Sequence, residues 1–325
     1  MKVGVIGLGS MGQNHARILS EMGVLEGVAD IVPAVAKSAG KRFSVKHYVN
    51  YRDMLKRDFD AIIIVTPTST HKKIASETIA AGKHLLLEKP MTGSSKDLKA
   101  LVALSNRKKV VLAGGFTERH NPAVEFAKRS VQSGDYGELI TAATRRVSSM
   151  PTRIRDIGVV MDLGIHDIDV LQHIVAKPPR TVYALGGISK GAKYEDHANI
   201  LIDFDGGETG FVEVNWLTPM KVRRLALTCN KNFVEVDYMD QSALVCSSSF
   251  KPVELSNLYN VPIEFDLRRV ALKKEEPLRR ELRDFLDSVD QDTTPLVTGK
   301  SATTTLKIAE AALRSMRTGT RQAVR

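Results

Sequence analysis

Asp162 and His166 stand four residues apart in a stretch whose pattern predicts a helix over residues 158–175. On a helix this spacing puts both side chains on one face, where the carboxylate can fix the tautomer of the imidazole and raise its basicity. His166 would then be a general base near neutral pH. The neighbouring Asp167 and Asp169 are expected to face solvent or to cap other groups. The same spacing also suits an amphipathic helix with a purely structural Asp–His pair, and this segment alone does not separate the two interpretations.

Lys89 is a second candidate for chemistry, because it lies just beyond a strand predicted over residues 83–87 and is flanked by Glu88 and Pro90. Pro90 restricts the backbone and biases the residue before it away from helix. A lysine ammonium at the end of a strand can hydrogen bond to a substrate hydroxyl and stabilise developing alkoxide charge. Taken alone, a lysine in such a place is usually only solvated.

The element that would bring a cofactor to these residues is the glycine loop Gly7-x-Gly9-x-x-Gly12. It follows a strand predicted over residues 3–6 and opens a helix predicted over residues 13–22. Gly7 allows a tight turn, Gly9 lets the backbone approach a pyrophosphate, and Gly12 lets helix and strand pack closely. The N-terminus of the helix offers free N–H groups to the phosphates. This order of strand, turn and helix favours dinucleotide binding over a glycine-rich turn without a ligand.

The type of dinucleotide follows from Asp30, which ends a second strand predicted over residues 24–30. It lies 18 residues after Gly12, close to the spacing at which an acidic residue hydrogen bonds to the ribose hydroxyls of the adenosine. Its charge would repel a 2′-phosphate, and no basic residue follows before Lys37. These features favour NAD over NADP. The alternative is that Asp30 is a solvated aspartate at a strand end with no role in cofactor binding.

Strands and helices alternate along the first third of the chain, which predicts a doubly wound parallel sheet of the Rossmann type. Further strands are expected at residues 46–49, 61–65, 83–87 and 110–112, with helices at 35–43, 51–56, 71–81 and 94–106. Ligands of such sheets lie beyond the carboxyl ends of the strands. Gly7, Asp30, Thr66, Glu88 and Gly114 all follow strands in this way, so they should share one crevice.

The pattern changes after residue 118, which predicts an NAD-binding domain over residues 1–118 and an α+β domain for substrate binding and oligomerisation over residues 119–325. Strands are expected at 139–147, 181–187, 198–204, 209–217, 223–229 and 233–238, and helices at 122–131, 158–175, 276–289 and 301–316. Turn sequences at 205–208 and 230–232 make these strands antiparallel. One face of the sheet should be open and partly polar, as expected of a subunit interface.

Composition limits the classes of function. The chain has 325 residues, of which 43% are hydrophobic and 26% charged, and its net charge of +10 is spread along the sequence, so no nucleic-acid partner is expected. The longest apolar run, residues 61–65, is far too short to span a bilayer, and the first strand leaves no room for a signal peptide. No membrane partner is expected, and the protein should be cytoplasmic. Cys229, Cys246 and the histidines show no metal-ligand spacing, so no metal is expected.

The glycine loop, Glu88-Lys89-Pro90 and Asp162-x-x-x-His166 occur in this order and at the usual separations, and the chain resembles the Gfo/Idh/MocA family of oxidoreductases over nearly its whole length. The resemblance implies that Lys89 holds the substrate hydroxyl, Asp162 orients His166, and His166 accepts the proton. It also implies an open-faced, mostly antiparallel C-terminal sheet through which dimers or tetramers form. Residues 66–71 match the family's cofactor-side loop. The full expected set of cofactor-binding residues is Gly7, Gly9, Ser10, Met11, Gly12, Asp30, Thr66, Pro67, Thr68, His71, Glu88 and Lys89.

Residues 118–124, with the sequence Glu-Arg-His-Asn-Pro-Ala-Val, resemble the corresponding segment of family members that oxidise the sugar of UDP-N-acetylglucosamine at its 3-position. This second resemblance implies that Arg119 and Asn121 bind substrate together with Lys89, Asp162 and His166. A basic protein would also attract an anionic nucleotide sugar. The family's scyllo- and myo-inositol dehydrogenases make an inositol 2-dehydrogenase the alternative.

These residues predict reversible hydride transfer between NAD and a ring hydroxyl carbon of a small-molecule sugar or cyclitol, with His166 as the proton acceptor. One rival is an NAD-dependent glycosidase, in which transient oxidation at the 3-position enables elimination. Another is a non-catalytic regulator that senses NAD. Lys89, Asp162 and His166 together argue against the regulator, because sensing requires none of the three.

Overall fold

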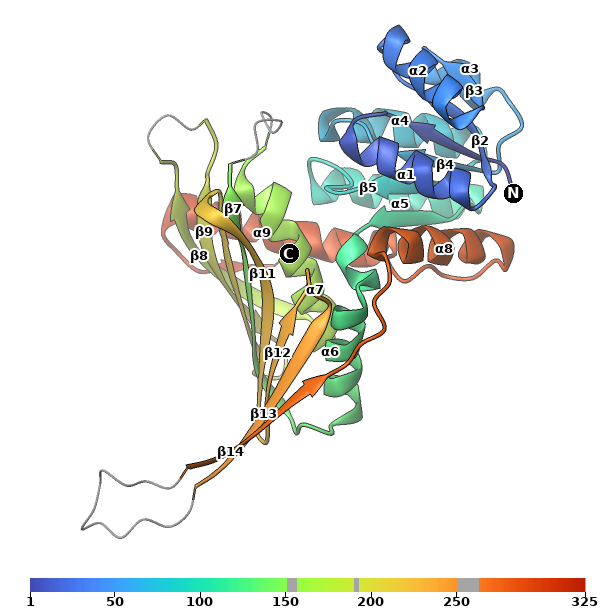
Figure 1. Cartoon of the computed structure of the whole chain (residues 1–325). Coiled ribbons are helices and arrows are strands. Elements are labelled where there is room, and N and C mark those ends of the chain that lie inside the picture. Colours follow the sequence, from blue (N-terminus) through green and yellow to red (C-terminus); the bar gives the residue numbers. More distant parts are fainter. Residues whose placement is uncertain (151–156, 190–192, 251–262, 325) are drawn as a thin grey trace, which may run out of the picture. The chain divides into compact units, whose positions relative to one another are not determined.

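The structure is a computed structural model, and it describes residues 1–150, 157–189, 193–250 and 263–324. The chain forms two compact units (Figure 1). The first combines Met1–His120 with Glu276–Lys307, and the second combines Asn121–Glu275 with Ile308–Arg325. The predicted division after residue 118 lies close to the first crossing between units, and the return of Glu276–Lys307 to the first unit was not part of that prediction.

The first unit is built on a six-stranded parallel sheet with the order β3-β2-β1-β4-β5-β6, which confirms the predicted doubly wound fold. Its strands are β1 (Val3–Ile6), β2 (Leu25–Ala29), β3 (Lys46–Tyr48), β4 (Ala61–Ile64), β5 (His84–Glu88) and β6 (Leu112–Gly115). Strands β1 and β4 are buried throughout, as their unbroken apolar runs require. Strand β6 begins and ends later than predicted, because Gly114 and Gly115, which interrupt the apolar pattern, pair with Leu87 and Glu88.

Among the described residues, the first five helices alternate with these strands, and two further helices join the first unit from later in the chain. They are α1 (Ser10–Glu21), α2 (Pro33–Phe43), α3 (Tyr51–Leu55), α4 (Thr68–Ala80), α5 (Ser95–Lys108), α8 (Pro277–Asp290) and the start of α9 (Gly299–Thr318). Helix α1 contacts α2 and α8, and α4 contacts α5. The apolar side of α8, with Leu282 and Phe285, shares a core with Leu19 of α1. Ser94 caps α5 as predicted, since its hydroxyl accepts the N–H of Asp97 at 3.2 Å.

The second unit contains a nine-stranded sheet with the order β14-β13-β12-β11-β7-β10-β9-β8-β15. Its strands are β7 (Leu139–Ser149), β8 (Pro179–Gly187), β9 (His197–Phe204), β10 (Thr209–Asn215), β11 (Leu217–Cys229), β12 (Phe233–Asp237), β13 (Ser242–Phe250), β14 (Ile263–Val270) and β15 (Gln322–Ala323). The sheet is mostly antiparallel, as predicted, but β7 and β10 pair in parallel. Strands β13, β14 and β15 were not predicted, because the serine-rich β13 and the two-residue β15 lack clear apolar alternation.

One face of this sheet carries helices α6 (Pro122–Ser133) and α7 (Ile165–Val175), which contact β12, β7 and β10 (Figure 1). Buried and half-buried residues alternate along β10, with Phe211, Glu213 and Asn215 half-buried. This alternation leaves a partly polar face turned away from the helices, as predicted.

The helix predicted over residues 158–175 is not regular. A π-helical segment, η2 (Val160–Gly164), precedes α7. The apolar pattern did not predict this change. Across the described ranges, no helix is both long and apolar enough to cross a membrane.

Candidate functional site

The glycine loop joins β1 to α1 and has the geometry that its sequence predicts. Gly7 has a φ of +92°, which favours glycine, and a Cβ atom there would lie 2.6 Å from the carbonyl oxygen of Val65. Gly12 packs against Gly7, since a Cβ atom at residue 12 would collide with the Gly7 carbonyl oxygen. A Cβ atom at Gly9, by contrast, would meet no described atom within 4 Å. Open space beside Gly9, at the N-terminus of α1, fits a dinucleotide pyrophosphate.

Asp30 directly follows β2, and its carboxylate organises the loops around it. Oδ2 accepts the N–H of Leu8 at 2.8 Å, and Oδ1 accepts the N–H of Val32 at 2.9 Å. The bond to Leu8 attaches Asp30 to the glycine loop. Each carboxylate oxygen can accept more than one hydrogen bond. Asp30 therefore keeps acceptor capacity for ribose hydroxyls beside the loop.

His71, on α4, connects the loops that follow β4 and β5. Its Nε2 lies 2.7 Å from the carbonyl oxygen of Thr66, and its Nδ1 lies 2.9 Å from that of Pro90. Burial lowers the pKa of His71, so the ring is neutral and donates to one of the two carbonyls at a time. The predicted cofactor-side loop is thereby attached to the residue that follows Lys89.

Lys89 follows β5, and the peptide bond between it and Pro90 is cis. Its backbone N–H donates to Oε2 of Glu88 at 3.0 Å, and Oε1 of the same carboxylate lies 2.8 Å from Nε2 of His15 on α1. Burial raises the pKa of Glu88, but the hydrogen bond from His15 and the charge of Lys89 outweigh it and hold the pKa below its ordinary value. Glu88 is therefore a carboxylate, and it uses both oxygens within the first unit.

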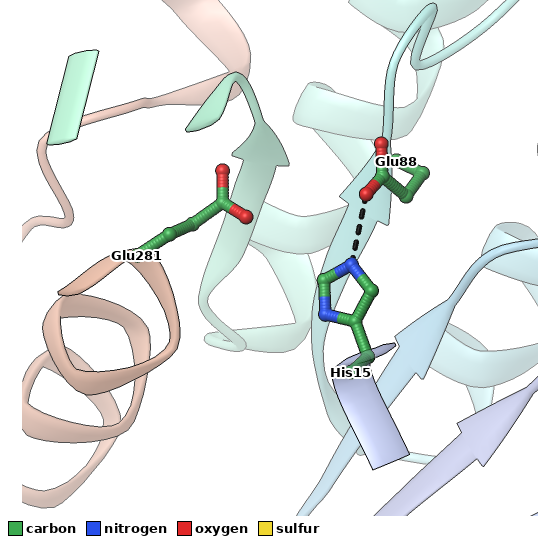
Figure 2. Close-up of side chains that lie close together, drawn as sticks. All are labelled: His15, Glu88 and Glu281. Carbon is green, nitrogen blue, oxygen red and sulfur yellow. Dashed lines mark hydrogen bonds and ion pairs between the residues drawn. The ribbon is translucent and has the colours of Figure 1, made fainter. Parts of the chain in front are cut away.

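A third side chain converges on this pair from α8. One nitrogen of His15 and one oxygen each of Glu88 and Glu281 lie within 4.8 Å of one another, and Figure 2 shows the Glu281 carboxyl group directed toward the other two. Oε2 of Glu281 accepts the hydroxyl of Thr117 at 3.3 Å. Burial and the charge of Glu88 raise the pKa of Glu281 well above its ordinary value. Sequence analysis missed this cluster, because its members come from α1, β5 and α8 and no local spacing links them.

Asp162 and His166 lie in the second unit, whereas Lys89 lies in the first. Asp162 is buried in η2, and His166 is half-buried in the first turn of α7. The backbone changes from π to α between them, an irregularity that is frequent at functional sites. The spacing argument for a regular α-helix therefore does not apply unchanged to this pair.

Asp167 and Asp169 were expected to face solvent or to cap other groups, and because both are fully buried, the first alternative was wrong. Oδ2 of Asp167 lies 2.6 Å from Nε of Arg146 on β7, and its Oδ1 lies 3.4 Å from Nη2. The guanidinium carbon also lies 5.5 Å from the centre of the Tyr238 ring. A buried carboxylate requires such a partner. Arg146 precedes Asp167 by 21 residues, and helix periodicity gives no sign of it.

Arg119 and Asn121, predicted to bind substrate, are both buried. Oδ1 of Asn121 accepts the N–H of Ala123 at 3.0 Å and caps α6, and its Nδ2 donates to the carbonyl of Tyr238 at 3.1 Å. Arg119 donates to the carbonyl of Leu296 at 3.4 Å. These contacts hold the backbone together, and substrate binding by the two residues stays a prediction.

Two family models match consecutive parts of the chain. The model of the oxidoreductase family with an NAD-binding Rossmann fold matches residues 1–116. The model of the GFO/IDH/MocA C-terminal domain matches residues 124–235. The first match contains the glycine loop and Lys89, and the second contains Asp162 and His166.

Full-length relatives agree with these matches. The chain is 28% identical to the UDP-N-acetylglucosamine 3-dehydrogenase of Acidithiobacillus ferrooxidans, over 89% of this chain and 88% of that protein. It is 27% identical to the scyllo-inositol 2-dehydrogenase (NAD(+)) of Bacillus subtilis, over 98% and 95%. The solved structure of the A. ferrooxidans enzyme superposes with a TM-score of 0.87 at 25% identity, covering 98% of this chain and 99% of that one. A levoglucosan dehydrogenase in complex with NADH superposes with a TM-score of 0.87 over 100% and 99% of the two chains, and at 19% identity this shows the shared fold alone.

Proposed function

This chain belongs to the Gfo/Idh/MocA family of oxidoreductases, and we propose that it oxidises the 3-hydroxyl of UDP-N-acetylglucosamine. It is an NAD-dependent enzyme of the sugar and polyol dehydrogenase class. Bound NAD supplies the acceptor for the hydride that leaves the substrate carbon. The observation that carries the choice of substrate is the full-length similarity, in sequence and in fold, to the UDP-N-acetylglucosamine 3-dehydrogenase.

In this proposal His166 accepts the proton of the substrate hydroxyl while the carbon–hydrogen bond breaks, and Asp162 orients its imidazole. Lys89 hydrogen bonds to the same oxygen and stabilises its developing negative charge. Local rigidity supports these roles: the Lys89 backbone is held by Glu88, and α7 is anchored by a buried ion pair. Catalytic side chains attached to rigid backbone keep a productive geometry.

The substrate is tested by incubating the protein with NAD and a panel of UDP-sugars and inositols while following NADH absorbance and the products. We expect NADH and a 3-keto nucleotide sugar from UDP-N-acetylglucosamine. NADH formation with an inositol alone would establish the inositol 2-dehydrogenase instead. Release of free sugar without net NADH would indicate the glycosidase, and NAD binding without turnover of any compound would indicate the sensor.

The general base is tested by His166→Ala, which should lower kcat by about 10²–10⁴-fold, as is typical when a positioned base is lost. Its effect on NAD affinity should be small, because the glycine loop lies in the first unit. His173→Ala is the matched control, since it makes the same change on the same helix and should keep its turnover. An unchanged kcat in His166→Ala would falsify the assignment.

The cofactor loop offers a matched pair of glycines. Gly12→Ala should lower the melting temperature and abolish NAD binding, because its methyl group collides with the Gly7 carbonyl oxygen. Gly9→Ala should fold normally, because its methyl group enters open space, but it should bind NAD more weakly, because that space is where we propose the pyrophosphate lies. Melting temperature and NAD titration measure the two effects. Wild-type NAD affinity in Gly9→Ala would place the pyrophosphate elsewhere.

Asp30 is tested by comparing NAD with NADP in the wild-type protein. Its carboxylate should repel the 2′-phosphate, so kcat/KM should be higher with NAD. A clear preference for NADP would contradict this role of Asp30.

We also propose that the sheet face opposite α6 and α7 forms a homodimer or homotetramer interface. Leu201 and Phe211 are directly paired on this face, and Leu201 is 49% exposed. Arg145 and Glu213 form an ion pair beside them at 3.1 Å. Apolar and paired polar groups together are typical of such interfaces. Analytical ultracentrifugation should show a dimer or tetramer that Leu201→Asp weakens, and a monomeric wild type would contradict the proposal.

A further inference from the structure

Two buried polar atoms of the first unit have no hydrogen-bond partner among the described residues: Nδ1 of His15 and Oε1 of Glu281. The residues are 0% and 1% exposed, and both belong to the cluster with Glu88 (Figure 2). A buried polar atom without a hydrogen-bond partner destabilises the folded state. A single arrangement that satisfied both atoms would remove both effects.

A metal ion is the first candidate, because an imidazole and two carboxylates are common metal ligands. Both oxygens of Glu88 are already engaged, however, with Nε2 of His15 at 2.8 Å and with the N–H of Lys89 at 3.0 Å. A metal ion there would have to displace the hydrogen bond between Nε2 of His15 and Oε1 of Glu88 or compete with it. We therefore favour a cluster held by hydrogen bonds, and zinc binding is the outcome that would decide against it.

The bond to Glu88 determines the tautomer of His15. A carboxylate only accepts hydrogen bonds, so Nε2 of His15 carries the ring hydrogen. In the neutral ring Nδ1 is then an acceptor and requires a donor. The remaining member of the cluster is Glu281, and a carboxyl group donates only when it is protonated.

The alternative charge state places an imidazolium between two carboxylates. That arrangement buries three charges, whereas a protonated Glu281 beside a neutral His15 leaves only the charge of Glu88. Each buried ion loses its hydration, so the state with one charge is favoured over the state with three. The surroundings agree: burial and the charges of Glu88 and Asp284 raise the pKa of Glu281, against the hydrogen bond from Thr117, which lowers it.

We propose that Glu281 is a neutral carboxylic acid whose Oε1–H hydrogen bonds to Nδ1 of His15 through one bridging water molecule, and that Glu281 and His15 position Lys89 through Glu88. The second part rests on the proposed function, in which Lys89 acts on the substrate. The chain of bonds runs from Glu281 to His15, then to the Glu88 carboxylate, and ends at the Lys89 backbone N–H. His15 and Glu281 are thus positioning residues.

The neutral acid is tested by infrared difference spectroscopy, which requires no turnover. A carboxylic acid C=O band should be present at neutral pH in the wild type and absent in Glu281→Gln. Asp287→Asn, which changes an exposed acid on the same helix, should leave the band in place. Nitrogen-15 NMR should show His15 as the neutral tautomer with hydrogen on Nε2. A missing band or an imidazolium spectrum would overturn the proposal, as would binding of one equivalent of Zn²⁺ that Glu281→Gln abolishes.

The positioning role is tested by kinetics. Glu281→Leu removes the donor and should lower kcat by about 10–100-fold, as small displacements of reacting groups do, with little change in KM for NAD. Glu281→Gln keeps an N–H donor and should recover most of that rate. Equal rates and pH profiles in Glu281→Leu and the wild type would overturn the positioning role.

Two further variants distinguish a failure of the positioning role from a failure of the proposed function of Lys89. If Glu281→Leu does not fold, His15→Gln breaks the same chain at Nδ1 and should lower kcat similarly, and an unchanged rate there would count against positioning. If Lys89→Ala keeps its turnover, the proposed function of Lys89 fails, whereas the infrared band still decides the state of Glu281.

Discussion

The two units bury charge in different ways. In the second unit Arg146 and Asp167 form a complete ion pair, with 2.6 Å between Nε and Oδ2 and exposures of 2% and 0%. In the first unit the Glu88 carboxylate is bonded to the His15 imidazole, the Glu281 carboxyl group lies beside them, and two atoms of the cluster have no partner among the described residues. The first arrangement balances its charges, and the second does not.

The difference indicates which buried groups stabilise the folded state. The balanced pair anchors α7 to the sheet, so breaking it should cost stability. The cluster of His15, Glu88 and Glu281 buries polar groups that are not all satisfied, which lowers stability. Destabilising arrangements of this kind are typical of functional positions. Its last bond ends at the backbone of Lys89. We infer that the first unit gives up some stability to place that residue.

The largest expected effect on the free energy of unfolding is at the Arg146–Asp167 ion pair. Asp167→Asn removes a buried counter-charge of the Arg146 guanidinium and should lower the free energy of unfolding by about 3–5 kcal/mol. Chemical denaturation measures this. The double variant Arg146→Met/Asp167→Leu removes both charges and should recover much of the loss. A loss in Asp167→Asn no larger than that of a surface pair would remove the distinction between the units.

A buried histidine of the first unit should make the protein sensitive to acid. Burial and the charges of Arg280 and Arg119 lower the pKa of His120 to about 3. Because the unfolded pKa is about 6.5, the stabilisation is complete above that pH and is lost as the pH falls toward the folded pKa. Stability should be about 2 kcal/mol lower at pH 5 than above pH 7 from this group. Denaturation across this range should show a weaker decline in His120→Gln.

The carboxyl group of Glu281 should make stability depend on pH in the opposite direction. The raised pKa of Glu281 means that stability is complete below its unfolded pKa and is lost as the pH rises toward the folded value. The stability of Glu281→Gln relative to the wild type should therefore increase with pH, and so should the difference between their melting temperatures. Thermal unfolding at mildly acidic and alkaline pH measures the slope. A difference that shrinks with rising pH would mean that Glu281 is charged when folded.

The smallest effect belongs to an exposed pair with the same contact distance as the buried one. Lys72 and Asp97 are also 2.6 Å apart, but they are partly solvated. Lys72→Ala should therefore cost only about 0–1 kcal/mol, because water screens the pair. Denaturation beside Asp167→Asn checks this. Equal losses in the two variants would show that contact distance, and not burial, sets the contribution.

The first unit was predicted more completely than the second, because its signals act over short segments. Gly7, Gly12 and Ser94 each serve a turn or cap a few residues away, so residue type is sufficient to predict them. The starts of α1 and α4 lay three residues before their predicted positions, because glycine, serine and threonine at a helix start weaken the apolar pattern. In the second unit β13 and the π segment lacked a comparable local signal, whereas the alternation of apolar and charged residues along β14 could have predicted that strand.

Residue types and their spacing were sufficient to predict the parallel sheet, the NAD-binding loop and the family, and they pointed to Lys89, Asp162 and His166 for catalysis. The partners of the buried groups became known from the packing of distant elements. It brought Glu281 of α8 to His15, and it paired Arg146 of β7 with Asp167. The physical reason is that periodicity reports which side of an element is apolar. The compensation of a buried charge depends on which distant element packs against it.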